Sequence, residues 1–371
     1  SVVTAGAAAA AVAAMQAVLR RGPEGIEITN AATAGTIHYL DAPLAQKVLA
    51  DGDVLWIGSE VSLTYRAPAD LPTNIPRIDL RGRAQISMGR ATNNDVALLH
   101  PAISRQHAKL IRRDGEFDIE DLGSSNGTYV NGKRLAARKP LALAVGDTLR
   151  LGPFKFFVTA EALEQSDESR DLRLDALHLN QPMPKGMNLL QDISLSILPR
   201  ELVAIVGASG VGKSTLIGAL TGTAPARQGA VLVNGSDLYH HYDAFRGHFG
   251  FVPQDDTLHK ELSVAQVLDY EAQLRLPADT TRAERAQRIN EVLRTLGLSE
   301  RRDAPIAQLN AGQCKRVSIG VELLAKPGLF FLDEVTAGLD PGTESQLMRL
   351  MRQLADAGHT MVLVTHATKN V

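Results

Sequence analysis

The chain contains Gly207-Ala-Ser-Gly-Val-Gly-Lys213-Ser214-Thr215, a glycine-rich stretch between two apolar runs. The run before it, 202–206, favours a strand and the run after it favours a helix. This is the pattern of a P-loop, in which backbone N–H groups surround phosphates. It predicts binding of a nucleoside triphosphate rather than a chance glycine-rich turn. The predicted contacts are Gly207, Ser209, Gly210, Gly212, Lys213 on the β- and γ-phosphates, Ser214 on Mg²⁺, and Thr215.

A second apolar run, Leu329-Phe-Phe-Leu-Asp333-Glu334, ends in two carboxylates. Attack of water on a γ-phosphate builds negative charge on the phosphoryl oxygens, so catalysis needs a lysine, a metal and a positioned water. We expect Asp333 to hold the metal through water and Glu334 to polarise the attacking water. An isolated Asp-Glu pair is more often a solvated turn, but its place at a strand end, downstream of a P-loop, favours the catalytic role.

Further signals follow the P-loop in a fixed order. Gln254 comes first, then Leu309-Asn-Ala-Gly-Gln313, then Gly338-Leu-Asp340 after the carboxylate pair. With the P-loop, this order resembles an ABC-type ATPase over about 171–366. Details such as Val-Ser-Ile-Gly-Val-Glu-Leu-Leu at 317–324 are similar to the White or G-type exporters.

The resemblance implies an α/β P-loop domain with a helical subdomain at about 255–325, and ATP with Mg²⁺ as cofactors. It implies that Gln254 contacts Mg²⁺ and the attacking water, and that His366 contacts the γ-phosphate. His366 also follows the apolar run 360–364, so it is expected at the ligand-binding edge of an open sheet. The remaining nucleotide contacts that the resemblance implies are Asn310, Gly312, Gln313 and Asp340.

The same resemblance implies a head-to-tail dimer, homodimeric or heterodimeric, because the signature of one subunit completes the P-loop site of the other. Such an interface closes on ATP, so nucleotide and dimer should stabilise each other. A permease region is expected after residue 371, which would place the chain at the cytoplasmic face of a membrane. The transported substrate does not follow from these residues.

Some residues depart from the ABC pattern. Asn310 and Ala311 stand where the family signature has Ser and Gly, and Val335 and Ala337 replace the usual Pro and Ser. No Phe, Tyr or Trp occurs from 158 to 238, where the family usually supplies a ring for adenine. Nucleotide binding is expected to persist, while the hydrolysis rate is the property that these departures affect.

Upstream of the P-loop, Gly89-Arg90, Ser104-Arg105-Gln-His107 and Ser124-Ser125-Asn126-Gly127-Thr128 are separated by short alternating stretches such as 117–120 and 149–151. This spacing favours a β-sandwich with functional loops at one end. The residues resemble a forkhead-associated (FHA) domain over about 76–158, a fold that binds phosphothreonine.

A phosphate on threonine carries nearly two charges and several acceptors, which an arginine fork and a hydroxyl can bind. We therefore expect a phosphothreonine peptide or protein, for example a substrate of a Ser/Thr kinase, as a partner. A surface ion pair is the alternative role for the arginine, and His107 and Gly89 are expected to hold the loops. The candidate phosphopeptide-binding residues are Arg90, Ser104, Arg105, Ser125 and Asn126.

A partial repeat of the pattern of this region precedes it in the sequence. Short patterns in 27–58 parallel those in 118–152 at offsets of 91 to 94 residues (118 minus 27 and 152 minus 58). A degenerate second half of the same fold is expected, without phosphate binding. An unrelated β-segment is the alternative, since the three FHA signals have no counterparts before residue 35.

The composition bounds the function classes. The 371 residues are 44% hydrophobic and 22% charged with net charge −2, which is typical of globular protein and argues against nucleic-acid binding. Cys314 is the single cysteine, so no internal disulfide can form. Ala5–Leu19 is too short and interrupted to span a bilayer, so it is expected to be an alanine-rich helix, with a trimmed membrane or signal segment as the alternative.

The expected fold class is multidomain, an all-β sandwich followed by an α/β P-loop NTPase. The expected layout is a helix or linker at 1–23, a partial FHA-like β-segment at 24–70, an FHA domain at 74–160, a linker at 161–171 and an ABC ATPase domain at 172–371. The leading hypothesis is the ATPase part of an exporter, regulated by phosphothreonine. The alternatives are a nucleotide-gated phosphopeptide scaffold with little turnover and a soluble, non-transport ABC ATPase.

Overall fold

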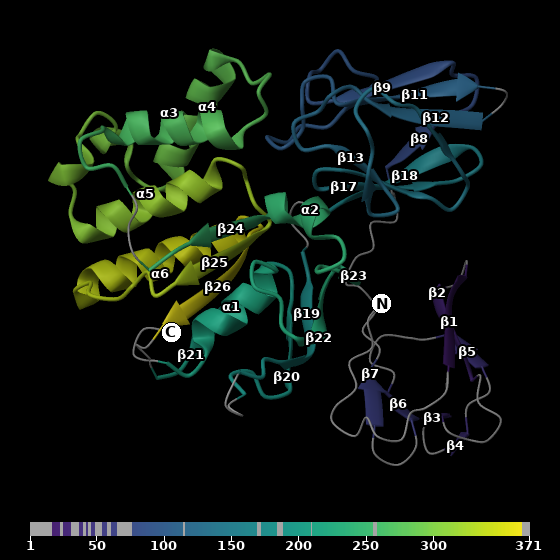
Figure 1. Cartoon of the computed structure of the whole chain (residues 1–371), viewed down its shortest axis with the longest axis horizontal. Coiled ribbons are helices and arrows are strands. Elements are labelled where there is room, and N and C mark those ends of the chain that lie inside the picture. The colour runs from purple at the N-terminus through teal and green to yellow at the C-terminus, as the bar shows by residue number, and fades with distance from the viewer. Residues whose placement is uncertain are drawn as a thin grey trace. The chain divides into compact units, whose positions relative to one another are not determined.

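The computed structural model describes the strands between residues 17 and 64, and then residues 76–113, 116–168, 172–183, 188–208, 210–254 and 258–365. The chain divides into two compact units, Ser1–Asn74 and Ile75–Val371. The second unit holds a β-sandwich followed by an α/β domain (Figure 1). Among the described residues, no helix is long and apolar enough to cross a membrane.

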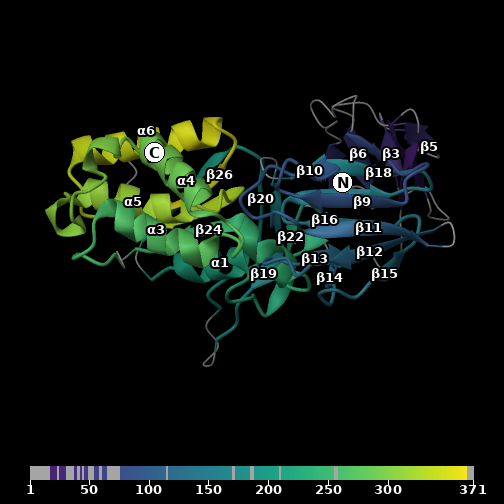
Figure 2. The same ribbon diagram turned by 90° about the horizontal axis from the view of Figure 1, so that it is seen from above.

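The sandwich consists of two mainly antiparallel sheets, and Figure 2 shows strands β9, β11 and β12 of one of them. Alternate residues of the strands point inward, and Ile86, Leu149 and Phe156 are fully buried between the sheets. One sheet has the order β10 (Val96–Ala97), β9 (Gln85–Gly89), β11 (Ala108–Arg113), β12 (Glu116–Asp121) and β15 (Leu141–Leu143). The other has the order β14 (Lys133–Arg134), β13 (Thr128–Val130), β16 (Thr148–Leu151), β17 (Phe154–Val158), β18 (Ala162–Asp167) and β8 (Arg77–Asp79).

The predicted linker at 161–171 is wrong for most of its length. Strand β18, Ala162–Asp167, lies between β17 and β8, so the sandwich continues past residue 160. Its first two residues, Ala162 and Leu163, are buried, whereas the polar residues after them are partly or fully exposed. Glu168 then forms a buried ion pair with Arg150 at 2.8 Å. The polar composition of this stretch therefore reflects an outward face and one buried pair, not a linker.

The α/β domain contains a parallel sheet in the order β21-β26-β25-β24 and an antiparallel sheet in the order β20-β19-β22-β23. One face of the parallel sheet packs on α5 and α6, and the other packs on α1 and the antiparallel sheet. The parallel strands are β21 (Leu202–Val206), β24 (Phe249–Val252), β25 (Leu329–Asp333) and β26 (Thr360–Thr365). The antiparallel strands are β19 (Leu174–Asn180), β20 (Ile193–Ile197), β22 (Gln228–Val233) and β23 (Ser236–Asp237).

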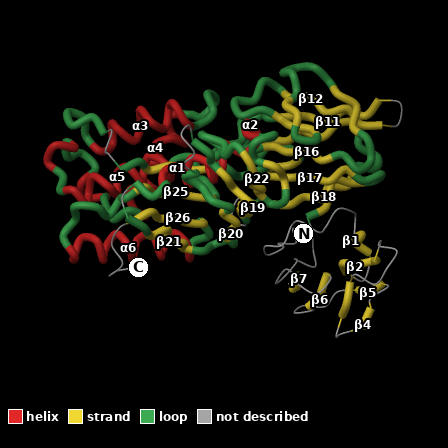
Figure 3. Tube along the Cα trace, turned by 60° about the horizontal axis from the view of Figure 1, so that its bottom comes forward, coloured by secondary structure: helices red, strands yellow, loops and turns green. Residues whose placement is uncertain are grey.

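The helices are concentrated in the C-terminal half of the chain, as the red segments of Figure 3 show. Three of them begin with a capping box, in which the side chains at the cap and three residues later each bind the other's backbone N–H. The helices are α1 (Lys213–Thr221), α2 (Tyr242–Phe245), α3 (Val264–Arg275), α4 (Arg282–Thr295), α5 (Ala311–Leu323) and α6 (Pro341–Asp356), with short 3₁₀ turns at Arg246–His248, Ser299–Arg301 and Ile306–Gln308.

The helical subdomain expected at about 255–325 corresponds to α3, α4 and α5, which pack on one another. Their shared core includes Leu268, Val292 and Val317. Gly320 of α5 lies where an added Cβ would be 2.6 Å from Leu296 Cδ1, so the glycine permits α5 to approach α4 closely.

The N-terminal unit contains two antiparallel sheets, with the orders β1-β2-β5 and β4-β3-β6-β7. These repeat the pairings β11-β12-β15 and β14-β13-β16-β17 of the sandwich, strand for strand. The prediction that this region is a partial copy of the sandwich stays a prediction, and the shared strand order supports it. The strands are β1 (Ala17–Gly22), β2 (Gly25–Asn30), β3 (Ile37–Tyr39), β4 (Ala42–Pro43), β5 (Gln46–Val48), β6 (Val54–Ile57) and β7 (Val61–Thr64).

The prediction of an alanine-rich helix at Ala5–Leu19 is wrong for the last three residues of that range. Residues 17–19 belong to β1, which pairs with β2 along its whole length. Helix propensity is a weak prior, and the partner strand β2 supplies the backbone hydrogen bonds here. Residues 1–16 lie outside the described residues.

Candidate functional site

The carboxyl ends of three parallel strands meet at one edge of the sheet. Val206 pairs with Thr365, and Asp333 pairs with Val364, so the residues that follow β21, β25 and β26 come together. The glycine-rich loop 207–212, the carboxylate pair and the start of α1 are thus neighbours. His366 is the next residue after β26 but lies outside the described residues. This edge is where open α/β sheets bind their ligands.

Lys213 is the first residue of α1, and its side chain is turned back over the loop. Its Nζ donates to the carbonyl oxygens of Gly207 at 2.9 Å and Ala208 at 2.8 Å, and it lies 3.8 Å from Glu334 Oε1. The side chain is only 7% exposed. The ammonium group is therefore held at the mouth of the loop, close to the carboxylate that is expected to act on water.

The loop fits a phosphate group. The N-terminus of α1 has no side-chain cap and no acidic residue in its first turn, so its backbone N–H groups are not covered by a side chain of the helix. Gly210 has φ +78° and an added Cβ there would meet no atom within 4 Å. Gly212 has φ +97°, and a Cβ there would lie 2.9 Å from the Leu189 carbonyl oxygen. Ser209 lies outside the described residues.

The predicted metal ligands lie beside the loop. Ser214 Oγ donates to Asp333 Oδ2 at 3.4 Å, which brings a hydroxyl and a carboxylate together as oxygen donors of the type that Mg²⁺ prefers. Glu334 follows directly and has φ +49°, in the left-handed region. Its N–H donates to the Val364 carbonyl oxygen at 2.9 Å, which holds this unfavourable conformation in place. The donor set fits Mg²⁺, and the described residues contain no cluster of three or more His, Cys, Asp and Glu side chains that would hold a metal alone.

Gln254 lies two residues after β24 and is exposed. Its carbonyl oxygen accepts a 2.7 Å hydrogen bond from Lys315 Nζ of α5. Lys315 is 7% exposed, which is unusual for a lysine, so the bond ties the predicted Mg²⁺-sensing loop to the helix that begins at Asn310. No motif of the sequence pointed to Lys315. Its position one residue after Cys314, among residues that face the core, was the only signal in the sequence.

The candidate phosphopeptide residues lie on loops at one end of the sandwich. Arg90 follows β9, and its Nε donates to the Ile103 carbonyl oxygen at 3.0 Å. Ser104 is 4% exposed, and its Oγ accepts the Ser125 N–H at 3.2 Å. Asn126 Nδ2 donates to the Ala102 carbonyl oxygen at 2.7 Å. The loops at 90, 104 and 125 are thus joined into one surface.

Two further residues hold these loops from behind. His107 is buried, accepts the Ser104 N–H at Nδ1 and therefore donates from Nε2 to the Gly127 carbonyl oxygen, at 3.2 Å each. Burial lowers the pKa of His107, which favours this neutral tautomer. A Cβ on Gly89 would lie 2.3 Å from the Arg105 carbonyl oxygen. Both residues thus fix the loop positions and are covered from solvent.

Comparison with known families agrees with this geometry. Residues 190–337 match the ABC transporter family model, and residues 86–152 match the FHA domain model. The chain carries an FHA domain followed by an ABC ATPase domain.

Relatives share this combination or its ABC part. The ABC transporter ATP-binding/permease protein Rv1747 of Mycobacterium tuberculosis is 38% identical over 286 residues, which cover 76% of this chain and 33% of that protein. The ABC transporter G family member 28 of Arabidopsis thaliana is 36% identical over 49% of this chain and 17% of its own length. The chain thus spans about a third or less of these relatives. The solved structure of cbiO1 from Clostridium perfringens is 32% identical, covers 54% of this chain and 81% of that one, and has a TM-score of 0.49.

The signature residues of the ABC domain lie at the start of α5. Asn310 is the N-cap, and its side chain and that of Gln313 bind each other's backbone N–H. Gly312 is buried, and a Cβ there would lie 2.2 Å from Thr343 Cγ2 of α6. Asp340 caps α6 by accepting the N–H groups of Gly342 and Thr343. The recorded bonds of Asn310, Gln313 and Asp340 are thus within their own helix ends and not to the P-loop of the same chain.

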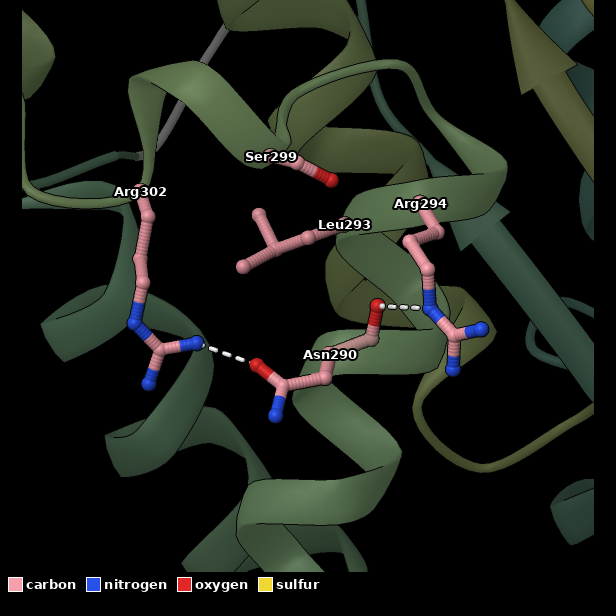
Figure 4. Close-up of a pocket in the computed structure, with 5 residues that line it drawn as sticks. All are labelled: Asn290, Leu293, Arg294, Ser299 and Arg302. Carbon is pink, nitrogen blue, oxygen red and sulfur yellow. Dashed lines mark hydrogen bonds between the residues drawn. The ribbon is translucent and has the colours of Figure 1, made fainter.

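A hollow of about 480 Å³ lies on the helical subdomain of the ABC domain, where residues of α4 and of the turn after it line it (Figure 4). Arg302 donates to the Asn290 side chain across it, and Arg294 Nε donates to the Asn290 carbonyl oxygen at 3.3 Å. Leu293 and Ser299 complete the lining. None of these residues belongs to the predicted nucleotide or phosphopeptide sites.

Proposed function

We propose that this chain is the ATP-binding and ATP-hydrolysing part of an ABC exporter whose activity is regulated by phosphothreonine binding to the FHA domain. The observation that carries the proposal is the meeting of Lys213, the Ser214–Asp333 pair and Glu334 at the carboxyl edge of one parallel sheet. The name of the macrolide export ATP-binding/permease protein MacB of Salmonella choleraesuis supports the export role, and the name of Rv1747 supports a pairing of ATP binding with a permease.

Each residue has a distinct task in this proposal. The α1 amides and Lys213 would bind the phosphates, and Glu334 would hold the water for in-line attack. Gln254 would also contact the attacking water, and His366 would contact the γ-phosphate. Ser214, Asp333 and Gln254 would hold Mg²⁺, which neutralises charge on the phosphoryl oxygens when bound. The left-handed backbone at Glu334 fixes the direction of its carboxylate relative to the loop.

The second half of the active site comes from a partner subunit in this proposal. Asn310, Gly312, Gln313 and Asp340 would contact the nucleotide of the partner in a head-to-tail homodimer or heterodimer. Ala311 is exposed at the first turn of α5, where its methyl group would face the partner's nucleotide. The closing of this dimer on ATP would be transmitted to a permease region of the same assembly at the cytoplasmic face of the membrane.

The FHA domain would bind a phosphothreonine peptide through Arg90, Ser104, Arg105, Ser125 and Asn126. Arg90 donates to Ile103 through Nε, so its two terminal nitrogens point toward other acceptors. A phosphate offers oxygens that these two nitrogens can bind. The joined loops would bind the peptide backbone on either side of the phosphothreonine. A partner phosphorylated by a Ser/Thr kinase is the expected ligand.

ATP hydrolysis by the purified protein tests the proposal, with Glu334→Gln as the matched variant. The substitution keeps the size of the side chain and removes the charge that polarises water, so turnover should fall by about a hundredfold or more while ATP binding persists. Turnover that survives in Glu334→Gln would contradict the assigned base. Absence of turnover in the wild-type dimer, with ATP bound, would favour the phosphopeptide scaffold instead.

A further inference from the structure

The loop between α3 and α4 contacts the FHA domain at its candidate phosphopeptide residues. Ala278 N–H donates to Ser125 Oγ at 3.1 Å, and Arg105 N–H donates to Asp279 Oδ2 at 2.5 Å. Figure 1 shows this loop on the side of the helical subdomain that faces the sandwich. The contact therefore joins residues about 150 to 175 positions apart in the sequence.

Arg90 makes the central contact. Its guanidinium group donates to Glu284 Oε1 and to Thr280 Oγ1, the latter at 3.4 Å, and lies 3.7 Å from Asp279 Oδ1. The Arg90 side chain is only 14% exposed. A threonine side chain and two carboxylates thus surround the same guanidinium group that is proposed to bind phosphate.

These groups reproduce the chemistry of phosphothreonine. A phosphothreonine offers a threonine side chain with close to two negative charges and several acceptor oxygens. Here Asp279 and Glu284 supply two negative charges and acceptor oxygens on either side of Thr280. Burial raises the pKa of Glu284, but hydrogen bonds from Thr281 and Arg90 outweigh it and lower that pKa, so the carboxylate stays charged at neutral pH.

We propose that the segment Ala278–Glu284 is an intramolecular ligand of the FHA domain, which a phosphothreonine peptide must displace to bind. The peptide part of this inference rests on the proposed function of the FHA domain, whereas the docked segment rests on the contacts above. A hollow of about 360 Å³, lined by Ala91, Asn93, Arg105 and Gln106 with Asp279, lies directly beside the docked segment. It gives an incoming peptide a place to bind before the segment leaves.

Other contacts hold the two domains together while this one opens. Tyr129 Oη donates to the Asp243 carbonyl oxygen at 3.0 Å, and the Arg150 guanidinium lies 4.7 Å from the Phe245 ring centroid. These contacts involve residues outside the helical subdomain. Displacement of the segment would therefore release α4 without separating the domains, and α4 packs on α5, which begins at the signature.

The test is the affinity of the purified protein for a phosphothreonine peptide. If the segment occupies the site most of the time, the apparent affinity is reduced by the fraction of molecules whose site is open. The double variant Asp279→Asn, Glu284→Gln removes both charges but retains the α4 cap, since glutamine fills the same cap position in α3 and α5. It should bind the peptide about tenfold more tightly than the wild type.

The matched control is Glu300→Gln, Asp303→Asn, which makes the same charge change at two exposed residues of the same subdomain. The control should bind the peptide like the wild type. Equal affinities in the wild type and in the Asp279, Glu284 variant would overturn the inference and leave phosphothreonine binding in place. An equal gain in the control would also overturn it, because the effect would then be one of net charge.

A second measurement separates the inference from the proposed peptide function. In a Cys314→Ser background, Ser125→Cys and Ala278→Cys should form an intramolecular disulfide on mild oxidation, because these residues are in hydrogen-bond contact. If no protein binds the peptide but the disulfide forms, the phosphothreonine function fails and the docked segment stands. If the disulfide does not form, the docked segment fails whatever the peptide does.

Discussion

The stability of the FHA loops depends on Asp121, which is 2% exposed at the end of β12. Its Oδ1 accepts the N–H groups of Gly123 and Ser124 at 2.9 Å each, and its Oδ2 accepts the hydroxyls of Ser124 at 2.6 Å and Thr128 at 2.7 Å. The loop between these residues carries Ser125 and Asn126. One carboxylate thus sets the shape of a loop that is proposed to hold the peptide.

Replacement of Asp121 by alanine leaves four donors without their acceptor. A hydrogen bond to a charged group contributes roughly 1.5–3 kcal/mol, and the two hydroxyls can rotate toward other acceptors. The expected loss of unfolding free energy is therefore about 3–5 kcal/mol, less than the sum of four such bonds. Peptide affinity should fall with it, while ATP binding in the ABC domain should not change.

The stabilisation that the Asp121 carboxylate provides also depends on pH. Burial raises the pKa of Asp121, but hydrogen bonds from Ser124, Thr128 and Gly123 outweigh it and lower that pKa below its unfolded value. A depressed pKa stabilises the fold above the unfolded pKa of about 3.9, and this stabilisation is lost as the pH falls through the folded value. Asp121→Asn should remove this dependence below about pH 4.

Hydrogen exchange against urea concentration, measured on peptides from 116–158, would report the FHA domain separately from the ABC domain. The control is Asp118→Ala in the same strand, whose carboxylate pairs with the 58%-exposed side chain of Arg113. It should cost about 1 kcal/mol or less. A loss in Asp121→Ala no larger than in the control would show that the Asp121 carboxylate does not hold this loop.

Two further predictions follow from close contacts. Gly89→Ala places a methyl group 2.3 Å from the Arg105 carbonyl oxygen. In a urea titration it should lower the unfolding free energy of the FHA domain by about 1–3 kcal/mol. Gly247→Ala is the control, because an added Cβ there meets no atom within 4 Å, and it should change that free energy little. A Gly89→Ala protein as stable as Gly247→Ala would show that the loop yields freely. Lys315→Met keeps the buried aliphatic part of the side chain but removes the hydrogen bond to Gln254. Steady-state kinetics should then show a kcat about tenfold lower, with the KM for ATP nearly unchanged. A rise in KM alone would contradict a positioning role for Lys315.

The local structure around the candidate nucleotide site could be predicted because each of its parts has a local signal in the sequence. A glycine-rich turn and an apolar strand that ends in carboxylates each specify a short piece of structure. The alignment of Val206, Asp333 and Thr365 at one sheet edge then follows from parallel pairing. Gly89 and His107 similarly carry short-range information about the FHA loops.

The parts that were missed depend on contacts between distant residues. Strand β18 was predicted as a linker because its polar residues give it the composition of one, and its pairing with β8 joins positions 83 to 87 residues apart (162 minus 79 and 164 minus 77). The start of β1 was assigned to a helix because alanine favours one, but its partner strand decides the structure. The docking of Asp279 and Glu284 on Arg90 has no local pattern at all, since acidic residues at the start of a helix are ordinary.

Phosphothreonine binding at the FHA domain is proposed to regulate ATP hydrolysis in the ABC domain. The most direct test is the ATPase rate of the purified protein with and without a phosphothreonine peptide, in the wild type and in Arg90→Ala, with Glu334→Gln as the blank. We expect a change of about twofold or more in kcat for the wild type and none for Arg90→Ala. The same response in both proteins, or no response in a wild type that is saturated with peptide, would contradict the claim.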